Sequence, residues 1–193
     1  MIKPEVRILG FDDGAFESKS KGKVPIVGVV FRGGKFLDGA LKTEVSIDGN
    51  DATEKIAKLI NSSKHKQQLK VIMFDGVTLG GFNIVDIKKL YKKTGLPVIV
   101  INRKVPNLKE VENALRNFKD FETRWKKILN AGKIKECNIK ENKKVYYQSI
   151  GLEEEEVEEI IKLSTTRSFI PEPLRVAHII ATAIVKGESS GRA

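Results

Sequence analysis

The sequence predicts an α/β protein: a mixed five-stranded sheet, made of an antiparallel meander and parallel strands, that is flanked by helices. Three apolar runs with short connections occupy residues 6–47, a pattern typical of an antiparallel meander. Two further apolar runs, at 69–74 and 96–101, are separated by a helical stretch, which favours a strand–helix–strand unit with parallel strands. At 193 residues, the chain is long enough for one domain with its own core.

The expected meander contains three strands, at 6–11, 24–32 and 36–47. Gly33-Gly34 lies between the second and third of these strands and is a tight-turn signal, so we expect an antiparallel hairpin there. The spacing of apolar residues then becomes helical over 51–60. Asp51, followed three residues later by Glu54, predicts a capping box at the start of this helix.

The second half of the chain is expected to be mainly helical. Helices are predicted at 84–95, 107–117, 120–131, 153–164 and 170–185, with a late strand or extended segment at 144–151. Pro173 suits the first turn of the last helix because it has no N–H to lose. No repeat or long linker divides the chain, so residues 1–193 are expected to form a single domain that ends in a flexible polar tail at 187–193.

The composition favours a polyanionic partner. The formal net charge is +10, with 35 Lys and Arg against 25 Asp and Glu. Such a balance favours nucleic acid through counterion release, whereas the alternative is a lysine-rich surface kept for solubility or heat resistance. Cys137 is the single cysteine, which excludes a disulfide within the chain and fits a reducing compartment. Without an apolar signal core or membrane span, the protein is expected to be cytoplasmic, with no membrane partner.

Acidic residues stand at the ends of expected strands. If the first and fourth strands lie side by side and parallel, Asp12 and Asp75 emerge together at the carboxyl edge of the sheet, the usual location of sites in open α/β sheets. Two facing carboxylates favour a cation between them, and Mg²⁺ or Mn²⁺ takes carboxylate oxygens, water and substrate phosphate. This arrangement predicts metal-assisted hydrolysis of phosphodiesters.

Each of these acids also has an ordinary structural interpretation. Asp12 or Asp13 could begin a turn with Gly14, and Asp75 could do the same with the glycine that follows it. Asp51 is most economically interpreted as a helix N-cap. Only the convergence of the acids at one edge of the sheet therefore indicates a site.

His178 is the histidine to consider in the last helix. It shares an apolar stripe with Leu174, Ala181 and Val185, where a histidine is more often a core residue than a catalytic one. That preference reverses if the helix packs across the acidic edge. Gly80-Gly81 lacks the spacing and the lysine of a Walker loop and the spacing of a dinucleotide-binding motif.

Four stretches together resemble the endonuclease V branch of the ribonuclease H-like superfamily, and most closely the archaeal endonuclease dU family. They are ILGFDD, DGNDATEKI, VIMFDGVTLGGFN with the following GLPVIVINRK, and PEPLRVAH. The last is the most specific, because endonuclease V proteins begin their closing helix with a similar Pro-Glu-Pro segment. The resemblance implies a ribonuclease H-like fold and a Mg²⁺-dependent endonuclease.

The resemblance also implies a set of metal ligands. It makes Asp12 the ligand from the first strand and Asp75 the ligand from the fourth. The acid near the first helix falls, in a gapless comparison, on Gly49, so that either Asp48 or Asp51 could serve. We favour Asp51, with Asp48 as the alternative.

Further residues acquire roles by the same resemblance. The lysine after the fifth strand of the family falls on Arg103, which could hold the scissile phosphate bidentately. His178 stands where endonuclease V has an aspartate and could orient water or phosphate. Gly80, Gly81 and Phe82 lie just beyond the fourth strand and are expected to contact the substrate.

Two departures from endonuclease V bear on the substrate. The segment LDGALKTEVSIDG has no aromatic wedge, and LGGFN replaces the histidine, proline and arginine that follow the fourth-strand aspartate. The family resemblance therefore implies a lesion other than hypoxanthine, namely deoxyuridine in DNA, and a role in DNA repair. Phe82 or Phe16 could stack on an extruded base, although both are more often core residues.

Two other functions stay open at this point. One is the same chemistry on RNA, and the other is a non-catalytic nucleic-acid-binding module, suggested by the exchange of aspartate for His178. A monomer or a small homo-oligomer is expected in each case.

Overall fold

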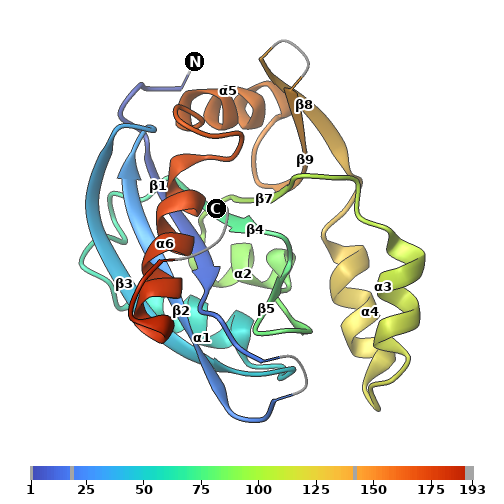
Figure 1. The fold of residues 1–193 in the computed structure, drawn as a ribbon. Coiled ribbons are helices and arrows are strands. Elements are labelled where there is room, and N and C mark those ends of the chain that lie inside the picture. Colours follow the sequence, from blue (N-terminus) through green and yellow to red (C-terminus); the bar gives the residue numbers. More distant parts are fainter. Residues whose placement is uncertain (1, 18–19, 141–142, 190–193) are drawn as a thin grey trace.

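The computed structural model describes residues 2–17, 20–140 and 143–189. It contains a seven-stranded sheet in the order β3-β2-β1-β4-β7-β9-β8 and a small β5-β6 hairpin (Figure 1). The strands are β1 Arg7–Asp13, β2 Lys23–Arg32, β3 Phe36–Ser46, β4 Val71–Asp75, β5 Thr78–Leu79, β6 Asn83–Ile84, β7 Val98–Asn102, β8 Lys135–Lys140 and β9 Lys143–Ile150. The helices are α1 Ala52–Asn61, α2 Ile87–Thr94, α3 Leu108–Leu115, α4 Phe121–Asn130, α5 Glu154–Ser164 and α6 Glu172–Lys186.

The strand directions bring three carboxyl ends to one edge of the sheet. β1 pairs with β4, and β4 with β7, in parallel, whereas β1-β2-β3 is an antiparallel meander. This is the mixed sheet that the sequence predicts. Asp12 near the end of β1 and Asp75 at the end of β4 consequently lie at the same edge.

Alternation along the strands divides the core into two layers. Leu9 and Phe11 of β1 belong to the layer covered by α1 and α2. Ile8 of β1 and Met73 of β4 belong to the opposite layer, which α5 and the start of α6 cover. Because side chains alternate along a strand, Asp12 and Asp75 face the α6 side, and Asp13 faces the α1 side.

Helix α6 crosses close over β1 and β2 (Figure 1). A Cβ added at Gly10 would lie 2.5 Å from the Cβ of Pro173, so this approach requires glycine in β1. Pro173 sits in the first turn of the helix, as predicted. The close packing of α6 on β1 carries His178 toward the edge where Asp12 lies.

The sheet has two more strands than predicted. The segment 144–151, expected as a strand or an extended segment, corresponds to β9, and β8 was not expected at all. The β8 sequence KECNIK has only Cys137 fully buried, because the strand lies at the sheet edge and exposes its Lys and Glu side chains. Such charged edge strands lack the apolar run by which the other strands are found.

The predicted capping box at α1 is wrong. Asp51 occupies the N-cap position, but its side chain makes no capping hydrogen bond and instead accepts from Ser46 and Asn83. At the other end of the chain, Gly187 ends α6 and residues 187–189 are exposed, whereas 190–193 of the predicted tail lie outside the described residues. Within the part of the chain that the structure describes, no helix has the length and apolar character needed to cross a membrane.

Candidate active site at the sheet edge

Asp12 and His178 form a direct pair at the end of β1. The Nδ1 atom of His178 lies 2.9 Å from Oδ2 of Asp12, which is itself only 9% exposed. Burial, together with the negative charges of Asp13 and Asp75, raises the pKa of Asp12 to about 7. His178 is therefore not a core residue on an apolar stripe, because α6 packs across the acidic edge.

Asp75 and Arg103 form a second pair beside the first. One guanidinium nitrogen of Arg103, Nη2, lies 3.4 Å from Oδ2 of Asp75, and the arginine side chain is 43% exposed. Burial raises the pKa of Asp75, although the Arg103 charge acts in the opposite direction. The exposed guanidinium keeps donors available toward solvent, where a phosphate group could bind.

The donor set suits a hard divalent cation. Asp12 and Asp75 are close enough for the charge of one to raise the pKa of the other, so a cation between them would relieve that repulsion. Among the described residues, no three His, Cys, Asp or Glu side chains gather closely enough to enclose a metal. Mg²⁺ commonly takes one or two carboxylates and completes its shell with water and substrate phosphate, which fits this pair.

Asp13 has a role that the sequence did not indicate. Its side chain lies on the opposite face from Asp12, and its Oδ2 atom accepts a hydrogen bond of 2.5 Å from the backbone N–H of Gly80. Burial raises the pKa of Asp13, and the Gly80 N–H acts to lower it. This hydrogen bond therefore holds the glycine turn between β5 and β6 against the end of β1.

Asp51 lies among hydrogen-bond donors of β3, α1 and β6. It accepts from the backbone N–H and the hydroxyl of Ser46 and from the amide of Asn83, and it pairs with Lys55 at 2.8 Å. Partial burial acts to raise the pKa of Asp51, but Lys55, Asn83 and Ser46 outweigh it and lower the pKa to about 2. Asp51 thus links β3, α1 and β6 through these hydrogen bonds and the ion pair. Its role as a metal ligand stays a prediction.

Asp48 has an unusual backbone conformation in the loop between β3 and α1. Its φ of 53° lies in the left-handed region, which makes it the one non-glycine residue with positive φ in the described part of the chain. Its backbone N–H donates to the carbonyl of Gly80, and its Oδ1 atom accepts from the N–H of Phe82, each at 2.8 Å. Because non-glycine residues with positive φ often mark functional positions, Asp48 is a candidate for a role beyond the loop itself.

An aromatic pocket opens beside this loop. It has a volume of about 690 Å³ and is lined by Phe16, Asp48, Gly81, Phe82, Ala114, Asn117 and Phe118. Of the predicted substrate residues, Gly81 and Phe82 line the pocket, and Gly80 binds Asp13. The same turn therefore contacts both the end of β1 and the pocket.

Arg124 of α4 holds one side of the pocket in place. Although only 4% exposed, its guanidinium donates to the carbonyls of Asp48, Gly49 and Phe82 and pairs with Asp120. It also lies 4.4 Å above the ring centre of Phe118. The sequence contained no signal for this residue, because an arginine in an amphipathic helix normally lies on the solvent face.

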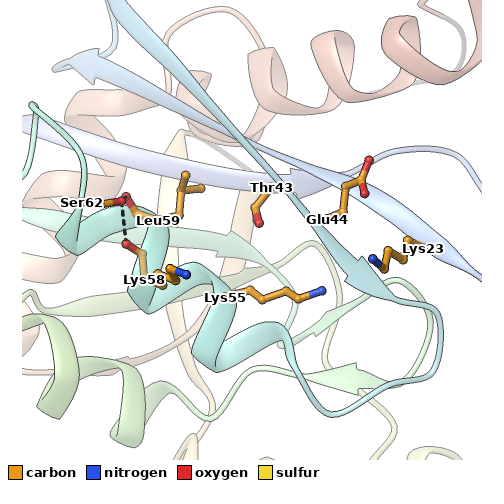
Figure 2. A pocket seen from close by; sticks show the side chains of 7 residues that line it. All are labelled: Lys23, Thr43, Glu44, Lys55, Lys58, Leu59 and Ser62. Carbon is orange, nitrogen blue, oxygen red and sulfur yellow. Dashed lines mark hydrogen bonds between the residues drawn. The ribbon is translucent and has the colours of Figure 1, made fainter.

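A second groove, between β3 and α1, is lined by lysines. Figure 2 shows the lining residues, which are Lys23, Thr43, Glu44, Lys55, Lys58, Leu59 and Ser62, around a space of about 420 Å³. Lys55 pairs with Asp51 at the start of α1, whereas Lys23 and Lys58 are exposed. Lys23 begins β2 at the end of the sheet where β1 finishes, but the groove lies on the α1 side of the sheet, whereas Asp12 faces α6.

Comparison with known proteins identifies the family. Residues 4–185 match the family model described as Endonuclease dU. A protein of Methanothermobacter thermautotrophicus, named only as a UPF0215 protein, is 51% identical over 193 residues, which is 100% of this chain and 94% of the relative. A solved structure from Archaeoglobus fulgidus, described as a protein of unknown function, has a TM-score of 0.85 and 40% identity over 94% of this chain and 99% of that one.

A more distant structural relative is endonuclease V. The protein from Ciona intestinalis, solved with a 24mer DNA that contains an inosine followed by a ribo-adenosine, has a TM-score of 0.62 and 14% identity over 94% of this chain and 87% of that one. At this identity the likeness concerns the fold alone, and it confirms the predicted ribonuclease H-like fold. With nearly its whole length matched by one family model and closely similar archaeal relatives, this chain belongs to the endonuclease dU family.

Proposed function

We propose that the protein is a metal-dependent endonuclease that hydrolyses phosphodiester bonds in damaged DNA, with deoxyuridine as the lesion and DNA repair as the role. One observation carries the proposal: the Asp12–His178 pair and the Asp75–Arg103 pair lie together at the carboxyl edge of parallel strands. The family match supports the nuclease chemistry.

The proposed roles follow from position and donor chemistry. Asp12 and Asp75 would hold Mg²⁺ or Mn²⁺, which polarises a phosphate oxygen and lowers the pKa of an attacking water. Arg103 would hold the scissile phosphate through its exposed guanidinium. His178, through the contact of its Nδ1 atom with Asp12, would keep that carboxylate oriented and present its other ring nitrogen to water or phosphate.

Nucleic acid is the partner that the surface supports. The Ciona intestinalis relative was solved with DNA, and the net charge of +10 here favours a polyanion. The lysine groove of Figure 2 lies between β3 and α1, where its exposed Lys23 and Lys58 could bind backbone phosphates of the strand at a distance from the cleaved bond. Lysine contacts of this kind position the strand without reading its sequence.

A cleavage assay with matched oligonucleotides tests the proposal. Duplexes that contain deoxyuridine, deoxyinosine or no lesion, and an RNA of the same sequence, are incubated with Mg²⁺, with Mn²⁺ or with chelator. We expect metal-dependent nicking at deoxyuridine that disappears in Asp12→Ala and Asp75→Ala but persists in Glu122→Ala, a change at an exposed acid of α4.

Each other outcome selects a different function. Metal-dependent cleavage of the RNA, but not of the deoxyuridine duplex, would assign the same chemistry to RNA. Tight, salt-sensitive binding without cleavage in any metal would identify a binding module. Cleavage that survives Asp75→Ala would contradict the proposed metal pair and point to a contaminating nuclease.

A further inference from the structure

We propose that the aromatic pocket receives a nucleobase and that Asp48 selects bases that carry an N–H at the ring position used for pairing. This inference rests on the proposed function, because it places the lesion of the substrate in a pocket beside the cleavage site. It adds a chemical reason for choosing deaminated bases over their parents.

The lining of the pocket suits a flat, uncharged ring. Phe16, Phe82 and Phe118 supply three aromatic rings, and Gly81 and Ala114 leave the remaining walls without bulky side chains. Phe82 and Phe118 meet edge to face, with their ring centres 5.6 Å apart, so the two rings support one another. Aromatic side chains are the surfaces on which proteins stack unpaired bases.

The pocket is joined to the catalytic edge through two short connections. Phe16 follows β1 four residues after Asp12. Asp13 binds the N–H of Gly80, next to the Gly81 that lines the pocket. The pocket therefore adjoins the end of β1, the strand that carries Asp12.

The Asp48 carboxylate is fixed in this pocket. Its backbone, held at positive φ, donates to Gly80 and accepts from Arg124, and its Oδ1 atom accepts from the N–H of Phe82. A Cβ added at Gly81 would clash with Oδ1, so glycine is required where the carboxylate packs. Within the described residues, Oδ2 has no hydrogen-bond partner, which leaves it free to accept one from a ligand.

An acceptor at this place distinguishes deaminated bases from their parents. Ring nitrogen N3 of cytosine is an acceptor, and deamination to uracil turns it into an N–H donor; the N1 atom of adenine changes in the same way on conversion to hypoxanthine. A carboxylate only accepts hydrogen bonds, so an oxygen placed opposite the ring nitrogen binds the N–H of the deaminated ring but meets the lone pair of the parent ring. Thymine and guanine also carry such an N–H, but in normal pairs their extrusion costs more than that of a mismatched base.

The test measures base preference separately from cleavage. Fluorescence anisotropy in the presence of chelator compares duplexes that contain uracil opposite guanine, N3-methyluracil opposite guanine, or a cytosine–guanine pair. Wild-type protein is expected to prefer uracil over both of the other bases by about tenfold or more, because a hydrogen-bonding site rejects an analogue that lacks the bond. Cleavage in Mn²⁺ is then measured on the same duplexes.

Two substitutions keep the backbone conformation while changing the acceptor. Asn and Gly both tolerate positive φ, so Asp48→Asn and Asp48→Gly should fold, as checked by thermal unfolding. We expect either change to reduce the preference for uracil over cytosine at least about tenfold, since the Asn amide can rotate to donate to cytosine and Gly offers no contact. Glu122→Gln, which removes one exposed charge from α4, should keep the wild-type preference.

The outcomes separate the inference from the proposed function. A preference that depends on Asp48, without cleavage in any metal, would support the pocket and reject the nuclease. Cleavage with equal preference for uracil, N3-methyluracil and cytosine in the wild type would overturn the pocket and leave the nuclease standing. An unchanged preference in both Asp48 variants, or no binding at all, would also overturn the inference.

Discussion

Asp12 and Asp51 sit at the same end of the molecule, yet their surroundings give them opposite chemistry. Asp12 is buried next to two other carboxylates, and the pKa of this residue is raised to about 7. Asp51 accepts hydrogen bonds from Ser46 and Asn83 and pairs with Lys55, and the pKa of that carboxyl is lowered to about 2. The comparison separates a desolvated acid beside other carboxylates, which we propose as a cation ligand, from an acid whose negative charge several donors already stabilise.

The largest expected effect comes from removing the two acids that we propose to hold the metal. In Asp12→Asn or Asp75→Asn, nicking of deoxyuridine DNA should fall by about 10³-fold or more, because metal assistance contributes several kcal/mol to the transition state. The free energy of unfolding without metal should stay level or rise, because each change removes a desolvated charge, which at Asp12 also lies beside other carboxylates. Single-turnover cleavage and urea unfolding measure the two quantities. Retained cleavage together with a large loss of stability would reverse the assignment.

The next effect concerns the arginine behind the pocket. Arg124→Met keeps much of the side-chain volume but leaves the carbonyls of Asp48 and Phe82 without this donor, so we expect a loss of about 3 kcal/mol in the free energy of unfolding. Arg116→Met, at a side chain that is 61% exposed on the neighbouring segment, should change it by about 0.5 kcal/mol or less. Equal losses in the free energy of unfolding of the two variants would show that the hydrogen bonds of Arg124 do not stabilise the pocket.

Replacing Asp51 should have the opposite effect to replacing Asp12. The free energy of unfolding should fall, whereas the cleavage activity should change little. The folded-state pKa of about 2 lies below the ordinary value of 3.8, so this carboxylate stabilises the fold above about pH 4 and loses that contribution as the pH falls toward 2. Asp51→Ala should therefore cost about 2 kcal/mol at neutral pH, and the difference from wild type should shrink on acidification. Urea unfolding over this pH range measures the difference.

A companion cleavage assay of Asp51→Ala tests the competing role. If Asp51 only joins β3, α1 and β6, the activity per folded molecule should remain within about tenfold of wild type, far above that of the Asp12 variant. Loss of cleavage with unchanged stability would instead establish Asp51 as the third metal ligand that the family resemblance implies.

The contrast also explains how far the sequence alone could lead. Asp12 and Asp75 were predictable because each follows an apolar strand, and parallel strands bring their carboxyl ends to one edge. His178 could not be decided, because its spacing fits a core stripe and only the packing of α6 on β1 turns it toward Asp12. Asp51 occupies the N-cap position, but the predicted capping box is wrong because its side chain accepts from Ser46 and Asn83 of other elements. Asp48 and Arg124 depend on backbone conformation and long-range contacts that no local pattern encodes.

The smallest effect is expected from changes in the lysine groove. Its lysines should contact DNA phosphates whatever the base sequence is. Replacing the exposed Lys23 and Lys58 by Ala should weaken DNA binding equally for every sequence and reduce the slope of log K against log salt by about two, because each lysine neutralises one phosphate. The matched pair Lys88 and Lys92, which is exposed on α2 and does not line this groove, removes the same charge. Anisotropy titrations at several salt concentrations measure the slopes. If both double variants lower the slope equally, the strand is attracted by net charge and not bound in the groove; if only the groove variant does so, the strand binds along β3 and α1.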